Sequence, residues 1–93
     1  MWILQSPDAT FRLQSGAVKT VGRAPRADFI VDAALVSRLH CRLTAGEHAL
    51  EVVDLESTNG TFVNDKRVEK ATLANGDRLR VGRVELTVNL ATQ

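Results

Sequence analysis

Apolar and polar residues alternate in the stretch RLRVGRVELTVNL, residues 78–90. Every second residue is apolar in residues 78–81 and again in residues 84–90, and Gly82-Arg83 lies between the two runs. Successive side chains of a strand point to opposite faces of a sheet, so this period of two predicts two strands that each bury one face. Glycine tolerates tight turns and marks the point where the two strands separate.

Shorter runs with strand character precede this stretch along the rest of the chain. Turn residues separate them, and residues 26–40 lack the i, i+3, i+4 spacing of an amphipathic helix. Residues 22–39 are interpreted mainly as loop around a short strand. Many short strands with closely spaced turns predict an all-β sandwich or barrel. The runs are residues 11–13, 18–21, 29–31, 41–43, 50–53 and 61–64, with turn signals at residues 15–16, 45–47, 59–60, 64–65 and 75–77.

The composition is that of an ordinary globular domain. The chain has 93 residues, of which 44% are hydrophobic and 25% charged, so we expect residues 1–93 to form a single domain. A net charge of +1 and few aromatic residues predict no nucleic-acid binding, and the lack of a long apolar run predicts no membrane span. The single cysteine, Cys41, is expected to be a buried apolar residue and suits the cytoplasm.

Three short polar motifs could carry a function. Gly22-Arg23 follows the run at residues 18–21, and its arginine either is solvated or presents a guanidinium fork to a phosphate or carboxylate. Ser37 and His40 precede another run, where both could equally be structural. In residues 54–61, DLESTNGT, a turn explains only the Asn-Gly pair, and the other hydroxyl and amide groups could converge on a ligand.

In this order and at this spacing, the three motifs resemble the signature of the forkhead-associated (FHA) family. The resemblance extends to residues 27–32, ADFIVD, and to residues 73–82, LANGDRLRVG, and covers about residues 2–90. It implies a β-sandwich of two twisted, largely antiparallel sheets with the binding loops at one end. It also implies a module that binds phosphothreonine in partner proteins during Ser/Thr kinase signalling, without catalysis and without a cofactor.

The resemblance assigns roles to individual residues. It implies that Arg23 and Ser37 contact the phosphate and that Arg38 contacts the phosphate or the peptide. Thr58 is then expected at the phosphothreonine, with Asn59 on the peptide backbone. Gly22, His40 and Gly60 are expected to support the binding loops, Gly22 by permitting the turn that presents the arginine. The family prefers phosphothreonine over phosphoserine through a small pocket for the threonine methyl group.

Other functions remain open as alternatives. The domain is expected to be a monomer whatever its function. It could be an FHA-fold scaffold that binds a partner protein independently of phosphate. Ser37, His40 and Asp54 are the residue types of a hydrolytic triad, but no Gly-x-Ser-x-Gly turn presents a nucleophile. The two histidines and the cysteine have no zinc-ligand spacing, so no metal site is predicted.

Overall fold

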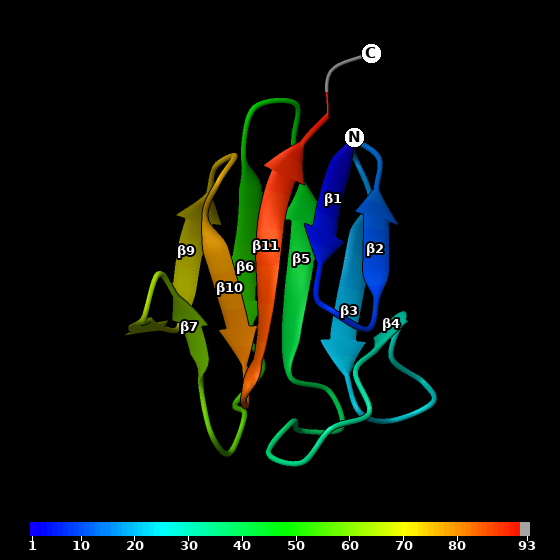
Figure 1. Cartoon of the computed structure of the whole chain (residues 1–93), viewed down its shortest axis with the longest axis vertical. Coiled ribbons are helices and arrows are strands. Elements are labelled where there is room, and N and C mark those ends of the chain that lie inside the picture. The colour runs from blue at the N-terminus through cyan, green and yellow to red at the C-terminus, as the bar shows by residue number, and fades with distance from the viewer. Residues whose placement is uncertain (92–93) are drawn as a thin grey trace.

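The computed structural model describes residues 1–91 and arranges eleven strands in two facing sheets (Figure 1). None of the described residues is in a helix, so none of them forms a helix that could cross a membrane. The predicted β-sandwich is confirmed. Its strands are β1 (Trp2–Gln5), β2 (Thr10–Leu13), β3 (Val18–Gly22), β4 (Phe29–Ile30), β5 (Cys41–Ala45), β6 (Leu50–Asp54), β7 (Thr61–Val63), β8 (Lys66–Val68), β9 (Lys70–Leu73), β10 (Arg78–Val81) and β11 (Val84–Leu90).

The six-stranded sheet contains the two strands predicted from the alternating stretch. Its order is β2-β1-β11-β10-β7-β8, and all its neighbours are antiparallel. Val81 pairs with Val84, so Gly82 and Arg83 form a two-residue turn between β10 and β11. Gly82 has a φ of +58°, a value that glycine adopts without strain.

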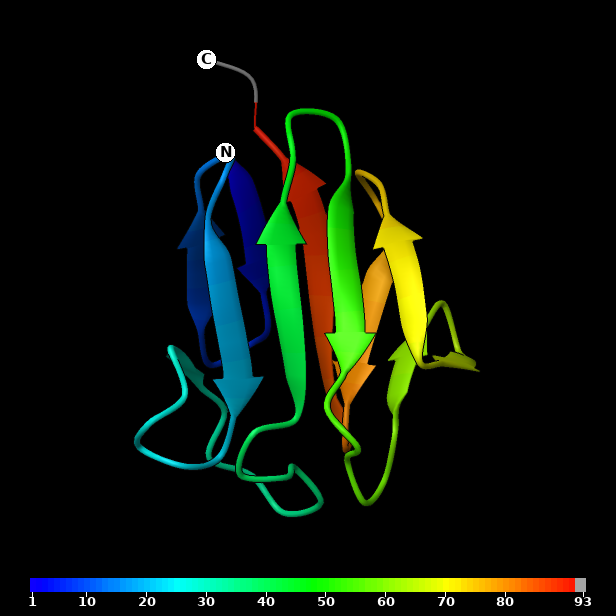
Figure 2. The same cartoon turned by 180° about the vertical axis from the view of Figure 1, so that it is seen from behind.

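The five-stranded sheet carries the less regular part of the chain. Its order is β4-β3-β5-β6-β9 (Figure 2), and β4 is parallel to β3 while the other neighbours are antiparallel. The short strand predicted within residues 22–39 is β4, and loop segments flank it on both sides as expected. Two largely antiparallel sheets are therefore confirmed.

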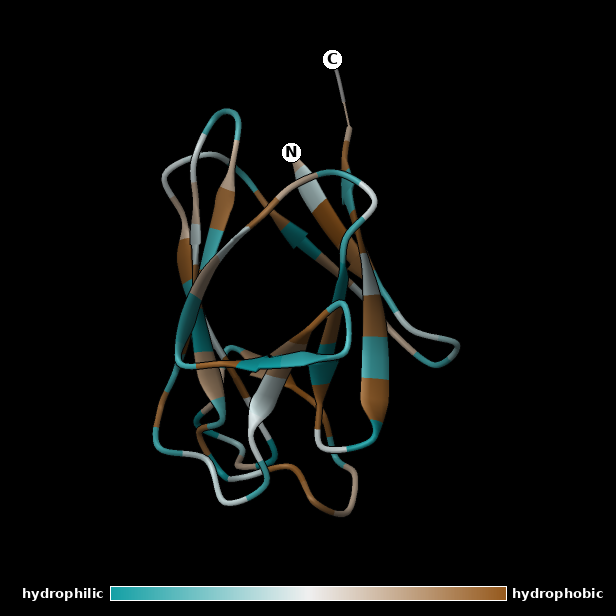
Figure 3. Ribbon diagram, turned by 90° about the vertical axis from the view of Figure 1, so that its left-hand side faces the viewer, coloured by the Kyte–Doolittle hydropathy of each residue, from teal (hydrophilic) through white to brown (hydrophobic). Residues whose placement is uncertain are grey.

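The core lies between the two sheets. Hydrophobic and hydrophilic residues alternate along several of the strands (Figure 3), and most of the apolar side chains in the strands face inward. Cys41 is fully buried among them, as predicted, and burial raises the pKa of its thiol to about 12. The buried cluster consists of Trp2, Leu4, Leu13, Val21, Val31, Val36, Cys41, Leu43, Ala45, Leu50, Val52, Leu73, Leu79, Val81, Leu86 and Val88.

Three strands lacked a clear signal in the sequence. In β1, Trp2 and Leu4 are buried but the outward Ile3 is also apolar, so no alternation marks the strand. Strand β8 is an edge of its sheet and begins with two exposed basic residues, and β9 is an edge of the other sheet. Charged side chains are common on edge strands, because they discourage pairing with another chain.

The Asn59-Gly60 pair does not close a hairpin, although Asn-Gly is a strong hairpin signal. Strands β6 and β7 belong to different sheets, so residues 55–60 cross from one sheet to the other. The two-residue hairpin in this region is Asn64-Asp65, where φ is +49° and +70°. Residues 55–60 lie at the same end of the sandwich as the segments on either side of β4 (Figures 1 and 2).

Candidate functional site

Three connecting segments form the lower end of the molecule in Figures 1 and 2. They are the β3–β4 loop (residues 23–28), the β4–β5 segment (residues 31–40) and the β6–β7 loop (residues 55–60). Seven of the eight residues that the sequence predicts for the site lie in these segments. The eighth, Gly22, is at the adjoining end of β3. The predicted motifs therefore meet at one end of the sandwich.

Gly22 provides space for the neighbouring backbone. It is the last residue of β3, and a Cβ atom there would lie 2.0 Å from the carbonyl oxygen of Arg38. The next residue ties the same two segments together, since the backbone N–H of Arg23 donates to the carbonyl of Ser37 at 2.9 Å. The close approach of two backbones therefore gives a reason for glycine at this position that the sequence did not show.

Arg23 is exposed, yet its side chain is partly oriented by the protein. Its Nε donates to the carbonyl oxygen of Val36 at 3.1 Å. A guanidinium has five N–H donors, and this hydrogen bond uses one of them. The two terminal nitrogens donate to no protein group within residues 1–91. The fork is therefore held at its base, and its outer donors can bind an anion.

His40 is fully buried and joins two of the three segments. Its Nδ1 accepts a hydrogen bond from the backbone N–H of Ser37 at 3.0 Å, and its Nε2 lies 2.8 Å from the carbonyl oxygen of Gly60. A carbonyl only accepts and an N–H only donates, so the neutral tautomer with its proton on Nε2 satisfies both contacts. The predicted supports His40 and Gly60 thus bond directly, 20 residues apart in the chain.

Two further hydrogen bonds connect the same segments at the surface. The Ser37 hydroxyl accepts from the backbone N–H of Thr58 at 3.1 Å, and Nδ2 of Asn59 donates to the carbonyl of Leu35 at 3.1 Å. Leu35 itself has a φ of +72° and an exposed side chain. Ser37, Thr58 and Asn59 are therefore brought together as predicted, and both loops are ordered by contacts within the protein.

A carboxylate beneath the β6–β7 loop was not predicted as part of the site. Asp54 Oδ1 accepts from the hydroxyls of Ser57 at 2.6 Å and Thr61 at 2.7 Å, and its Oδ2 accepts from the Ser57 backbone N–H at 3.1 Å. The Ser57 hydroxyl in turn accepts from the N–H of Gly60 at 3.0 Å. The signal in the sequence was an aspartate three residues before a serine, a spacing that suits a local side-chain turn.

These hydrogen bonds determine the ionisation of Asp54. Burial acts to raise its pKa, but the hydroxyl donors of Ser57 and Thr61 and the Ser57 backbone N–H together outweigh burial. The pKa of Asp54 is therefore lowered from its ordinary value. An ionised carboxylate accepts stronger hydrogen bonds than a neutral one, so the charged form holds the loop more firmly.

The alternative of a hydrolytic triad does not fit these contacts. Both ring nitrogens of His40 are bonded to backbone groups, and neither bonds to the hydroxyl of Ser37. The carboxylate of Asp54 is bonded by Ser57 and Thr61 and makes no hydrogen bond to the imidazole. A triad requires a chain of hydrogen bonds from nucleophile to base to acid. The three residues here act as separate structural anchors.

Arg23 and Arg38 line one surface hollow of about 270 Å³, together with Ala24 and Pro25. Both arginine side chains are exposed, and neither lies within 4.0 Å of a carboxylate among residues 1–91. Two guanidinium groups on a hollow without an acidic partner suit an anion chemically, because each supplies several charge-assisted donors. The nearby hydroxyl of Ser37 can add another donor.

Comparison with known proteins identifies relatives that match most of the chain. The family model for the FHA domain matches residues 19–82. The glycogen accumulation regulator GarA of Mycobacterium tuberculosis is 38% identical over 85 residues, which cover 90% of this chain and 52% of that protein. The oxoglutarate dehydrogenase inhibitor of Corynebacterium efficiens is 35% identical and is covered to 60%. The chain thus spans about half the length of these curated relatives.

A solved structure from work on phosphothreonine-dependent FHA domain interactions superimposes with a TM-score of 0.90 and 34% identity. The superposition covers 99% of this chain and 98% of that one. The FhaA FHA domain, complexed with the intracellular domain of Rv3910, superimposes with a TM-score of 0.87 and 35% identity. In that case 96% of this chain and all of the other are covered.

Proposed function

The chain belongs to the FHA domain family, and on this basis we propose that it binds phosphothreonine in partner proteins and so acts as an interaction module in Ser/Thr kinase signalling. The observation that carries the proposal is the hollow lined by Arg23 and Arg38 on loops that the protein itself orders. Binding without catalysis is part of the proposal, and so are a single domain, a monomeric state and a cytoplasmic location.

The chemistry of the ligand matches the donors at this end of the sandwich. A phosphate ester carries a charge of about −1.5 to −2 at neutral pH and has three acceptor oxygens. We assign Arg23 and Ser37 to the phosphate, and Arg38 to the phosphate or the peptide. Charge-assisted hydrogen bonds contribute about 1.5–3 kcal/mol each. Three of them, together with contacts to the neighbouring peptide residues and less the cost of ordering the peptide, give an affinity on the order of micromolar.

Thr58 is assigned to the phosphothreonine, and Asn59 to the peptide backbone beside it. Asn59 uses its amide nitrogen to hold the carbonyl of Leu35, which leaves its side-chain oxygen to accept from a peptide N–H. The Thr58 backbone N–H donates to the hydroxyl of Ser37, so this hydrogen bond ties the two residues together. Gly22, His40 and Gly60 are assigned to the support of the loops and contact no ligand.

A scaffold that binds a protein independently of phosphate is the second candidate. What favours the phosphate-dependent function is the charge of the hollow, because two guanidinium groups without an acidic partner repel one another when no ligand is bound. A surface that recognised its partner by shape complementarity alone would not need two adjacent guanidinium groups.

The test uses peptides that differ only in the phosphate. An oriented phosphothreonine peptide library first selects a sequence, and calorimetry then compares that peptide with its unphosphorylated and phosphoserine twins. We expect binding on the order of micromolar for phosphothreonine. The unphosphorylated twin is expected to bind at least about a hundredfold more weakly, since two or more charge-assisted hydrogen bonds are lost. Equal affinity for the phosphorylated and unphosphorylated peptides would show a phosphate-independent scaffold instead.

The phosphoserine twin tests the preference within phosphorylated ligands. A small pocket that accepts the threonine methyl group gains the burial of one methyl, worth about 0.8 kcal/mol or fourfold in affinity. Equal binding of the two phosphopeptides would remove threonine from the proposal and leave phosphate recognition intact.

A further inference from the structure

Arg26 is not among the residues assigned to the phosphate, to the peptide or to the support of the loops. It lines a second hollow of about 610 Å³, whose other walls are Ala24, Pro25, Arg38 and Leu39. This hollow adjoins the one beside Arg23, since Ala24, Pro25 and Arg38 line both. Arg38 therefore lies between two hollows, with Arg23 on one side and Arg26 on the other.

The loop that carries Arg26 is held at both ends. The backbone N–H of Ala27 donates to the carbonyl of Ala24 at 3.0 Å, which places Pro25 and Arg26 at the centre of a tight turn. At the base of the loop, Thr20 and Asp28 exchange hydrogen bonds: the Thr20 N–H donates to Asp28 Oδ2 at 2.8 Å, and the Asp28 N–H donates to Thr20 Oγ1 at 3.0 Å. Arg26 is thus presented from an ordered backbone.

The nearest acidic residue in the sequence does not neutralise this arginine. The carboxylate of Asp28 accepts from both the N–H and the hydroxyl of Thr20, and these hydrogen bonds lower its pKa. Among residues 1–91, no carboxylate lies within 4.0 Å of the guanidinium groups of Arg23, Arg26 or Arg38. Three positive charges therefore line two adjoining hollows with no negative charge against them.

This is more positive charge than one phosphate requires. A phosphothreonine brings about −1.5 to −2 charges at neutral pH, which Arg23 and Arg38 match. Arg26 then remains uncompensated beside a bound phosphopeptide. Like charges at close range raise the free energy of the unbound domain, and a second anion on the ligand relieves this repulsion.

We propose that Arg26, together with Arg38, binds a second anionic group of the ligand, a carboxylate or a phosphate, beside the phosphothreonine. The inference rests on the proposed phosphothreonine binding and specifies the ligand further. The β4–β5 segment lies between the loop of Arg26 and the β6–β7 loop (Figure 2). The second anion therefore binds on the side of the phosphate that faces away from Asn59.

The test moves one negative charge along a neutral phosphopeptide. Alanine-based peptides with one phosphothreonine carry a single glutamate at successive flanking positions, and a second set carries a second phosphothreonine at the same positions. Fluorescence anisotropy measures their affinities at one fixed ionic strength, because surface electrostatics depends on salt. We expect at least one position at which the added anion raises the affinity of the wild-type domain about fivefold.

The variant Arg26→Ala is expected to lose this gain and to bind the peptide without the second anion within about twofold of the wild type. Arg12→Ala is the matched control, since Arg12 is an exposed arginine on β2 and its replacement removes the same charge. A gain with glutamate identifies a carboxylate as sufficient, whereas a gain with the second phosphothreonine alone identifies a phosphate.

Three results would overturn the inference while leaving phosphothreonine binding in place. These are no gain at any position, a full gain in Arg26→Ala, and an equal loss of the gain in Arg12→Ala, which would show a general effect of net charge. Failure of the wild type to distinguish the phosphorylated from the unphosphorylated peptide would overturn the proposed function, and the inference with it.

Discussion

The backbone N–H of Ser37 donates to Nδ1 of His40, three residues further along the chain, at 3.0 Å. The opposite ring nitrogen lies 2.8 Å from the carbonyl oxygen of Gly60. One buried imidazole thereby connects the β4–β5 segment, which carries Ser37 and Arg38, with the loop that carries Thr58 and Asn59. The relative position of the proposed phosphate and peptide contacts depends on this side chain.

Replacing His40 by alanine should destabilise the domain by about 2–4 kcal/mol. The change leaves the Ser37 N–H and the Gly60 carbonyl without partners in a buried site, and each unsatisfied group costs about 1–3 kcal/mol. Urea denaturation measures the loss. His40→Asn should recover part of it, because the amide oxygen of asparagine can accept from the Ser37 N–H.

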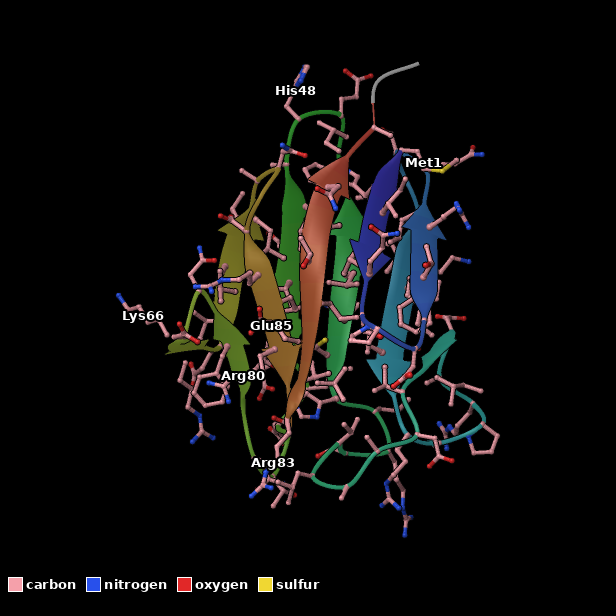
Figure 4. The ribbon with its side chains drawn as sticks, in the orientation of Figure 1. Met1, His48, Lys66, Arg80, Arg83 and Glu85 are labelled. Carbon is pink, nitrogen blue, oxygen red and sulfur yellow. The ribbon has the colours of Figure 1, made fainter. Side chains whose placement is uncertain are left out.

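His48→Ala is the control for this prediction. His48 lies at the end of the sandwich opposite the binding loops (Figure 4), and 94% of its side chain is exposed. Its replacement should change the free energy of unfolding by less than about 0.5 kcal/mol. If His40→Ala were as stable as His48→Ala, the imidazole would not be the connection between the two loops.

Replacing Arg23 by alanine should weaken phosphopeptide binding about a hundredfold or more, because two charge-assisted hydrogen bonds to phosphate are lost. Its unfolding free energy should stay within about 1 kcal/mol of the wild type, since only the hydrogen bond to Val36 is removed. Arg23→Lys should be weakened less, as the charge remains but the fork does not. Calorimetry and urea denaturation give the two values.

Arg83→Ala is the matched control, because Arg83 is exposed at the same end of the molecule (Figure 4) but lies in the β10–β11 turn. We expect the affinity of this variant for the phosphopeptide to fall by no more than about threefold, as for an exposed charge that does not line the hollow. Wild-type affinity in Arg23→Ala would contradict the assignment of this residue to the phosphate.

Replacing Gly22 by alanine should cost about 3 kcal/mol or more of stability. The added Cβ would lie 2.0 Å from the carbonyl oxygen of Arg38, and backbone hydrogen bonds of 2.9 and 3.1 Å hold the two segments in place. Gly76→Ala is the comparison, because no atom lies within 4 Å of its Cβ and only its φ of +92° opposes the change. That substitution should cost about 1–2 kcal/mol. Equal losses in thermal or urea unfolding would show that crowding at Gly22 is relieved by a small shift.

Asp54→Asn should destabilise the domain at pH 7 by about 1–3 kcal/mol, since a charged acceptor of three hydrogen bonds is replaced. The folded pKa of Asp54 is lowered, so its stabilising contribution is complete above the unfolded pKa of about 3.9 and is lost as the pH falls through the folded value. The difference between wild type and variant should therefore shrink below about pH 4.

Urea denaturation at several pH values tests this, with Glu47→Gln as the control. Glu47 is an exposed carboxylate in the β5–β6 turn, and its only ion pair among residues 1–91 is a 4.0 Å contact with the exposed His48. Its replacement should give a small difference at each pH. A wild-type to Asp54→Asn difference that stays constant from pH 7 to pH 3 would contradict the proposed role of the ionised carboxylate.

Phosphopeptide binding should weaken as the pH falls from 7 to 5. The second pKa of a phosphate ester is about 6, so the dianion becomes a minor species at pH 5, and a site that requires it loses affinity up to about tenfold. Calorimetry across this range measures the change, with circular dichroism to show that the domain remains folded. A flat response would mean that the monoanion is bound equally well.

Much of the fold could be predicted because burial on one face leaves a visible pattern. Residues 84–90 form a strand at the expected bounds, since each apolar side chain enters the core and each polar one faces solvent. Strand β1 was missed because Ile3 is apolar on the outer face, and β8 because its exposed edge position gives no alternation. Where the pattern of burial is interrupted, local sequence cannot reveal a strand.

The sequence by itself determined the residue types of the candidate site and the sandwich that carries them. The order of Gly22-Arg23, Ser37 to His40 and residues 57–61 resembles the FHA signature, and this resemblance named the donors, whereas each motif taken alone left a structural role open.

Only the tertiary structure decided how these residues meet. Gly22 serves a close approach of two backbones, Asn59-Gly60 crosses between sheets, and Arg26 adjoins the same hollows as Arg38. The contact of His40 with Gly60 joins positions 20 residues apart. The physical reason is that the path of each loop depends on which sheet its two strands join. Strand pairing between distant segments sets that choice, and no short stretch of sequence encodes it.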